Sequence, residues 1–347
     1  MNRAARNILR QAAVRAGLEA IALSRAGRLW PAAGGRGVIF TLHHVRPREA
    51  KAFDPNAHLS VTPEFLEEAI LAAGECGLTP VALEELPSLL ADRGDRRRFV
   101  SFTLDDGYRN NAAFAAPVFR KHSVPYTIFV TAGFVERSRA PWWETAGRLV
   151  GKLDRLEFDF GHGAEALGLE TDARKQAAFE RLAEFVQAGD EDEAVARIDE
   201  AARNHGVDPL AMVAELTMDA GELRCLAKDP LARFGAHTLT HANLRRVDDQ
   251  RLRREITESA KAVEAYVGRY PRSFAFPYGF PSAVGDREIR AVAEAGFEIA
   301  VTTQPGVLRA SSLEQQTVFN RVSLNGLYQQ KRYVKALISG LPFKLMR

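Results

Sequence analysis

The chain has 347 residues, with 47 Lys and Arg against 44 Asp and Glu and a formal net charge of +3. This length can hold one large α/β domain or two small ones, and the apolar and charged fractions are ordinary for a globular protein. The two cysteines, Cys76 and Cys225, lie far apart and outside any Cys-x-x-Cys spacing, which argues against a disulfide framework and a zinc ribbon.

The small net charge hides two basic ends. Residues 1–30 contain six arginines and one acidic residue, Glu19, while residues 327–347 contain five basic residues and no acidic one. The central body is therefore net negative, which argues against a nucleic-acid-binding surface on it. We predict a basic helical segment over residues 1–33 and a basic tail or helix over residues 326–347.

The N-terminal segment does not resemble a secretory signal, because arginines recur through it and no uninterrupted apolar core follows them. No window of the chain approaches the roughly 18 consecutive apolar residues expected of a membrane-spanning helix. Two interpretations stay open for the segment. It forms either a surface helix with solvated arginines, or a helix lying on an anionic membrane face beside the C-terminal stretch Tyr333–Ile338. We expect a cytoplasmic protein, either free or peripherally attached to the inner membrane face.

After a linker at Pro31–Gly35, short apolar runs alternate with helical patterns. The predicted strands are residues 37–42, 80–83, 99–104, 126–131, 233–236, 273–276, 298–302 and 318–322. The predicted helices include residues 63–76, 111–122, 250–267 and 286–295. This alternation predicts a parallel sheet, and the number of units favours a barrel. Residues 144–219 interrupt the rhythm and are predicted to form a helical insertion.

Polar residues directly follow several of these strands. They are His43, Asp105, Asp106, His237 and the Pro277-Tyr278-Gly279 segment. In a parallel barrel the loops at the carboxyl ends of the strands form the active face. We therefore expect these residues to meet at one rim.

The adjacent carboxylates of Asp105 and Asp106 would repel each other at the end of a buried strand, so their charge must be compensated. A divalent metal held by one Asp together with His237 and His241 would do so and would leave the other Asp free as a base. A His₂-carboxylate set also leaves coordination positions open for water and substrate. A histidine pair at this spacing alone would more often be structural, so the hypothesis depends on the combination.

Three segments resemble the polysaccharide deacetylases, the NodB-homology group of carbohydrate esterase family 4. Thr103–Gly107 resembles the family's T-F-D-D-G block, His237–His241 its H-[ST]-x-x-[HN] metal block, and Phe274–Gly279 its block ending in P-Y-G. The resemblance covers about residues 36–325. It implies an α/β fold, an irregular (β/α)₇ TIM-like barrel, and removal of an acetyl group from an N-acetylated sugar.

The resemblance also implies roles for individual residues. Asp105 would be the base, and Asp106, His237 and His241 would bind a divalent metal, with zinc expected and cobalt, nickel or manganese as alternatives. A backbone N–H near Pro277 and Tyr278 would hold the oxyanion. Trp142 and Trp143 could stack on a sugar, although packing against the insertion is an equal alternative.

The chain departs from the common pattern of the family in two places. Typical members supply the general acid from a C-terminal L-x-H block, but no histidine follows His241. The segment Phe40–Val45 resembles instead the Y-H-x-V element of the circularly permuted branch, which includes biofilm poly-N-acetylglucosamine deacetylases. That places the acid at His43, with His44 as the alternative register. Ala275 stands where many members have an arginine that orients the base.

The expected function is that of a metal-dependent hydrolase that removes N-acetyl groups from a sugar, an oligosaccharide or a glycolipid precursor, similar to chitooligosaccharide deacetylases. Two alternatives remain. One is a catalytically degenerate homologue that only binds carbohydrate, which the missing C-terminal histidine and Ala275 favour. The other is a metal amidohydrolase of a non-sugar amide.

Overall fold

The computed structural model describes residues 3–24, 27, 30–49 and 51–345. Its centre is a parallel sheet whose strands follow the order β11-β10-β9-β6-β5-β1-β12, with β4 paired to β5. The strands are β1 (Gly37–Leu42), β4 (Leu78–Pro80), β5 (Arg98–Leu104), β6 (Tyr126–Val130), β9 (Ala232–Ala236), β10 (Ser273–Ala275), β11 (Ile299–Val301) and β12 (Val322–Ser323).

The sheet closes on itself through the segment that leads into β12. Phe40 of β1 pairs with Val322 of β12, and Phe319 forms a parallel bridge with Val301 of β11. The strand path therefore returns to its start, and the predicted irregular (β/α)₇ barrel is confirmed. The last predicted strand, 318–322, is shifted, because residues Ala310–Val318 form a 3₁₀ segment and regular pairing begins only at Val322.

The two-residue period of the strands decides which side chains face the barrel interior. Ile39, Phe99 and Phe129 pack together in an inner apolar cluster, whereas the alternate residues Val100 and Phe102 pack against the surrounding helices. Continuing the same alternation past the strand ends brings His43 and Asp105 to the inner face. The rim predicted from sequence follows from this register.

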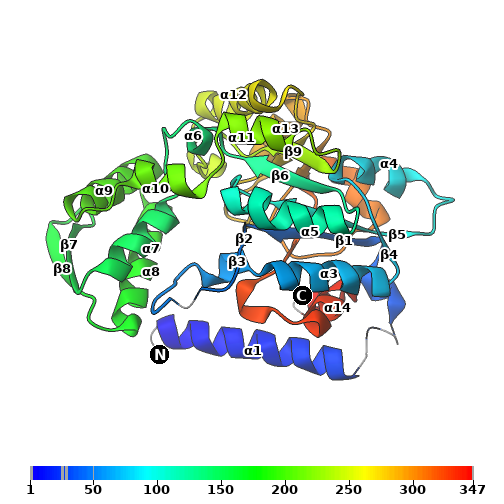
Figure 1. Ribbon diagram of the computed structural model, residues 1–347, viewed down its shortest axis with the longest axis horizontal. Coiled ribbons are helices and arrows are strands. Elements are labelled where there is room, and N and C mark those ends of the chain that lie inside the picture. Colours follow the sequence, from blue (N-terminus) through cyan, green and yellow to red (C-terminus); the bar gives the residue numbers. More distant parts are fainter. Residues whose placement is uncertain (1–2, 25–26, 28–29, 50, 346–347) are drawn as a thin grey trace.

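Helices cover the outside of the barrel (Figure 1), and most were predicted within a few residues. They include α3 (Pro63–Glu75), α5 (Ala116–Lys121), α11 (Ala220–Leu226), α12 (Asp249–Val267) and α13 (Asp286–Glu294). Thr62 caps α3 by accepting a hydrogen bond from the Phe65 N–H, and Pro63 opens the helix. The predicted strand 80–83 is displaced to β4, because Leu83 starts a 3₁₀ turn (Leu83–Glu85).

Residues between α7 and α10 form a separate lobe beside the strand ends (Figure 1), where the sequence predicts a helical insertion. The lobe contains α7 (Trp142–Lys152), β7 (Arg155–Asp159), β8 (Ala164–Gly168), α8 (Asp172–Ala188), α9 (Glu191–Asn204) and α10 (Pro209–Leu216). It has its own apolar cluster, which includes Leu149, Leu182 and Ile198. The antiparallel hairpin β7–β8 was not predicted.

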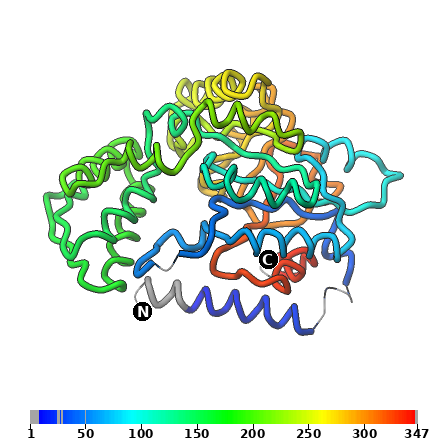
Figure 2. The backbone as a smooth tube through the Cα atoms, viewed as in Figure 1, coloured from blue at the N-terminus to red at the C-terminus, as the bar shows by residue number. Residues whose placement is uncertain are grey.

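The two chain ends pack against each other (Figure 2). Helix α1 (Arg3–Ser24) lies along α14 (Lys331–Ile338), which is followed by α15 (Leu341–Leu345), and Leu18 is buried against Tyr333. Lys331 and Lys335 both pair with Glu75 of α3. These C-terminal cations therefore form intramolecular ion pairs. None of the helices within the described ranges is both long and apolar enough to span a membrane.

Candidate active site

Asp105 and Asp106 diverge at the end of β5. The Asp105 N–H donates to the Leu42 carbonyl at 3.0 Å and so continues the sheet pairing by one residue. Asp106 then adopts a left-handed conformation with φ 72°, which is unfavourable for a residue with a side chain. Thr238, His241 and Tyr278 also have positive φ. Such local strain is typical of functional sites and here separates two neighbouring carboxylates.

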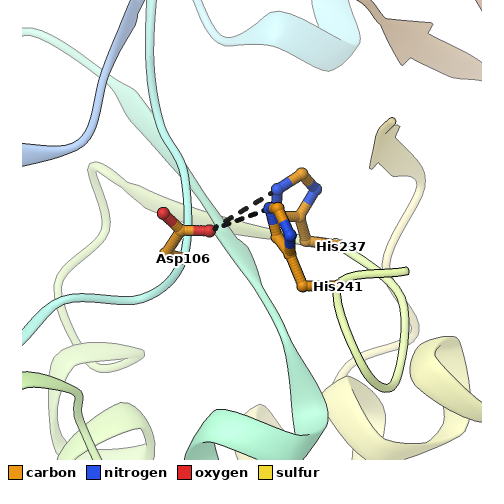
Figure 3. A group of neighbouring side chains, drawn as sticks. All are labelled: Asp106, His237 and His241. Carbon is orange, nitrogen blue, oxygen red and sulfur yellow. Dashed lines mark ion pairs between the residues drawn. The ribbon is translucent and has the colours of Figure 1, made fainter. Parts of the chain in front are cut away.

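Asp106 faces two histidines (Figure 3). Its Oδ1 lies 3.6 Å from Nε2 of His237 and 3.6 Å from Nε2 of His241, and the side chains of Asp106 and His237 are at most 2% exposed. These separations are too long for hydrogen bonds but suit ligands that share one ion, since metal–nitrogen and metal–oxygen bonds measure about 2.0–2.2 Å. The geometry brings together the three predicted ligands.

The unsatisfied atoms in this cluster fit a cation. Among the described residues neither carboxylate oxygen of Asp106 has a hydrogen-bond partner, and both are buried. Burial and the charge of Asp105 raise the pKa of Asp106 well above its usual value. His237 Nδ1 lies 2.7 Å from the Ala275 carbonyl, so it carries the proton and leaves the Nε2 lone pair facing Asp106. A divalent metal would satisfy these groups.

Glu255 of α12 holds the loop that carries His241. Its carboxylate accepts hydrogen bonds from the Leu239 N–H at 2.9 Å, the Thr240 N–H at 3.0 Å and the Thr240 hydroxyl at 2.7 Å. Glu255 is 1% exposed. This role was not predicted from the sequence, because on a helix of mixed charge Glu255 looks like any surface glutamate.

Asp105 is held by a buried arginine whose role was likewise not predicted from the sequence. Arg321 donates to both Asp105 carboxylate oxygens at 2.7 Å, to the Thr103 hydroxyl at 3.0 Å and to the Thr302 carbonyl at 2.8 Å. Burial alone would raise the pKa of Asp105, but the charge and hydrogen bonds of Arg321 outweigh it and hold that pKa well below its ordinary value. Asp105 is therefore ionised. Ala275 stands where many family members have an arginine, whereas in this chain Arg321, directly before β12, contacts Asp105. The available signal was a lone arginine inside the predicted strand 318–322.

The two adjacent histidines differ in their surroundings. His43 Nε2 lies 4.0 Å from Asp105 Oδ2, and 22% of the His43 side chain is exposed. His44 is fully buried, with Nε2 3.3 Å from Glu144 Oε1 and Nδ1 2.7 Å from Asn110 Nδ2. Its ring centroid lies 3.6 Å from that of Tyr108, with the two rings tilted by 30°. Because His44 already has partners on both nitrogens, the geometry favours His43 as the acid. Burial lowers the pKa of His43 to about 4, although the Asp105 charge opposes this.

Tyr278 lies beside the histidines, with its ring 5.1 Å from that of His241. Its hydroxyl donates to Glu191 Oε1 at 2.6 Å, and its carbonyl accepts from the Thr303 hydroxyl at 2.6 Å. Its own N–H donates to no acceptor among the described residues. The left-handed backbone at this position thus leaves one free N–H near the metal ligands, next to Pro277.

Trp142 and Trp143 are buried by packing and are not exposed to a substrate. They are 7% and 8% exposed, and their indole N–H groups donate to the hydroxyls of Tyr278 at 3.0 Å and Tyr108 at 3.1 Å. The Trp143 ring lies 4.7 Å from that of His241. Of the two readings of these tryptophans, the structure therefore supports packing between barrel and insertion, since little ring face remains for a sugar.

Comparison with known proteins places this geometry in a family. The sequence profile described as polysaccharide deacetylase matches residues 92–161 and 171–302, which is more than half of the chain. The match includes both carboxylates and both metal-site histidines but not His43 or Arg321. No curated protein sequence matches the chain.

Several solved structures share the fold. BC0361, a polysaccharide deacetylase from Bacillus cereus, superposes with a TM-score of 0.52 at 15% identity, over 86% of this chain and 68% of that one. IcaB from Ammonifex degensii superposes with a TM-score of 0.51 at 16% identity, over 86% of this chain and 96% of that one. A de-N-acetylase from Aggregatibacter actinomycetemcomitans superposes with a TM-score of 0.51 at 12% identity, over 82% of this chain and 93% of that one.

Proposed function

The chain belongs to the polysaccharide deacetylase family and is a hydrolase of that class, and from this premise we propose that it removes N-acetyl groups from a carbohydrate with the help of a divalent metal. Asp106, His237 and His241 would hold the metal. The observation that carries the proposal is the buried Asp106 carboxylate, which faces two histidine nitrogens at 3.6 Å and has no hydrogen-bond partner among the described residues. The nitrogen and oxygen ligands suit zinc, and also cobalt, nickel or manganese.

Such a metal, when bound, polarises the acetyl carbonyl and lowers the pKa of water. The chain's own residues do the rest. Asp105, kept ionised and oriented by Arg321, accepts the proton of the attacking water. The free N–H of Tyr278 donates to the oxygen of the acetyl group as negative charge develops on it.

His43 protonates the departing amine. Since its pKa is lowered to about 4, it is neutral in the free enzyme near pH 7 and must first receive a proton. Asp105 lies 4.0 Å away and has just taken one from water. Passage of that proton from Asp105 to His43 and on to the amine would balance the reaction. The products are the neutral amine and acetic acid, whose remaining proton is released to solvent or to the amine near pH 7.

The first experiment combines metal analysis with acetate release across N-acetylated sugars, oligosaccharides and simple amides. The variant Asp105→Asn should keep its metal and lose turnover. Unchanged turnover in a metal-loaded Asp105→Asn protein would overturn the assignment of the base. Activity on simple amides alone would point to a non-sugar amidohydrolase, and metal binding without turnover on any substrate would point to a binding protein.

We also propose that α1 attaches the enzyme to an anionic membrane. Its exposed side carries Leu9 (56% exposed) and Leu23 (72% exposed), with small alanines between them, and Arg10 beside them. An apolar face beside an exposed arginine suits the interface of acidic lipids. The variant Leu9→Ser/Leu23→Ser should sediment less with anionic vesicles than the wild type does, and equal sedimentation of both would argue against attachment.

A further inference from the structure

A basic pocket of about 570 Å³ lies between α1 and the segments that follow β2 (His44–Val45) and precede α14. Its charged lining comprises four cations and two carboxylates. These are Arg15, Arg46, Arg48 and Lys51, with Glu49 and Asp54. The pocket therefore has an excess of positive charge within a chain whose central body is net negative.

The four cations are not held in ion pairs by the described residues around them. None of them forms an ion pair with a described residue, whereas the basic residues of α14 are paired with Glu75 and Glu19. Within the described part of the chain, the Arg15 guanidinium donates to the Leu327 carbonyl at 3.2 Å, and the Arg46 guanidinium donates to the Ser60 hydroxyl at 2.8 Å. Neither acceptor carries a negative charge. The Asp54 carboxylate is turned toward its own loop, since its Oδ1 accepts a hydrogen bond from the Asn56 N–H at 3.1 Å. The cations are thus available to an anion from outside.

One lining residue of the pocket lies close to the proposed acid in the sequence. Arg46 is three residues after His43, a span of at most about 11 Å. The charges of Arg46 and Lys51 also help to lower the pKa of both His44 and Glu144, after the effects of burial and of the hydrogen bond between those two residues. A second pocket of about 470 Å³ is lined by Arg46, Lys51 and Glu144, and so continues from the basic pocket toward the partner of His44.

We propose that this basic pocket binds a phosphate group of the carbohydrate substrate while the acetyl group lies at Asp106. Arginine forks and lysine ammonium groups recognise phosphate oxygens through charge-assisted hydrogen bonds. The volume suits a sugar phosphate. The inference rests on the proposed deacetylation and adds that the preferred substrate is a phosphorylated, N-acetylated glycan. The phosphate could belong to a free glycan phosphate or to the diphosphate that joins a glycan to a lipid.

The test compares acetate release from an N-acetylglucosamine oligosaccharide, from the same oligosaccharide with a reducing-end phosphate, and from a lipid-diphosphate form. The wild type should show a higher kcat/KM for the phosphorylated forms. In Arg48→Gln/Lys51→Gln that preference should fall about tenfold, the scale expected when charged hydrogen bonds are lost. The control Arg93→Gln/Arg96→Gln removes the same charge from two exposed arginines without ion pairs to described residues and should keep the preference.

A preference for both phosphorylated forms would show that the pocket recognises the phosphate group itself. A preference for the lipid form alone would show that it recognises the lipid-borne diphosphate. Equal kcat/KM for all three substrates, unchanged in Arg48→Gln/Lys51→Gln, would overturn the inference and leave the proposed function intact. If no substrate released acetate, the proposed function would fail instead. Calorimetric titration with inorganic diphosphate would then test phosphate binding by the pocket directly. Binding that is weakened in Arg48→Gln/Lys51→Gln would support the inference, and undetectable binding to the wild type would overturn it.

Discussion

The guanidinium of Arg321 contacts both carboxylate oxygens of Asp105 at 2.7 Å, although 216 residues separate the two along the chain. Both side chains are nearly inaccessible to solvent, at 0% and 3% exposed. The contact exists because β12 closes the barrel beside β1, one strand away from β5. It links closure of the fold to the ionisation of the proposed base.

The variant Arg321→Met should be strongly destabilised, because it leaves the Asp105 carboxylate buried without its counter-charge. Removing one partner of a buried ion pair typically lowers the free energy of unfolding by about 3–5 kcal/mol. Urea denaturation at pH 7 measures the loss. In Asp105→Asn/Arg321→Met both charges are absent, so this double variant should be more stable than Arg321→Met alone. A double variant no more stable than the single one would contradict the account.

The same pair predicts a pH dependence. Because Arg321 lowers the pKa of Asp105 in the folded state, the stabilisation it provides is present above the pKa of an unfolded aspartate, about 3.9, and is lost only as pH falls further. In Arg321→Lys the pKa of Asp105 should rise, since a lysine cannot form the two-pronged contact. We therefore expect the acidic limb of the kcat/KM profile to move to higher pH in this variant, and an unmoved limb would speak against the role.

His43→Ala should lose about 10²- to 10⁴-fold in acetate release from N-acetylated sugars, the usual contribution of a general acid. The loss should nearly vanish with 4-nitrophenyl acetate, because nitrophenolate departs without being protonated. A comparison of kcat for the two substrates separates this role from a structural one. His44→Asn serves as the control. It disturbs the contact with Glu144 and should affect stability and both substrates alike.

Metal removal should change stability in a direction that depends on Asp106. Removing the metal from the wild type with a chelator should lower its melting temperature. Without the metal, the Asp106 carboxylate stays buried and dehydrated with nothing to compensate its charge. The variant Asp106→Asn lacks that charge. We expect its melting temperature to respond little to added zinc, and to exceed that of the metal-free wild type. A wild type indifferent to both chelator and zinc would refute the proposed centre.

The sequence predicted the parts of this site that depend on local pattern. Asp105 and Asp106 follow a buried strand, and the four-residue spacing of His237 and His241 is visible without a structure. Arg321 and Glu255 could not be assigned, because their roles come from contacts that form only when distant elements meet. The choice between His43 and His44 was an intermediate case. The match of Val45 to the Y-H-x-V element favoured His43, but every residue of β1 is buried, so only the structure shows that the inward alternation of Ile39 reaches His43.

The lobe residue Asp199 supplies a prediction outside the site. It is half-buried on α9, and burial raises its pKa to about 6 against the opposing charges of Arg139 and Arg203. Because the folded pKa exceeds that of an unfolded aspartate, stability is highest below about pH 4 for this group and declines as pH rises through 6. The variant Asp199→Asn should therefore be more stable than the wild type at pH 7.5, by about 1–2 kcal/mol after allowance for solvent screening, and nearly equal to it at pH 4.5. Urea titrations at the two pH values measure the difference, and Asp172→Asn on α8, an exposed residue, is the control. A stabilisation of equal size at both pH values would show that titration of Asp199 is not its cause.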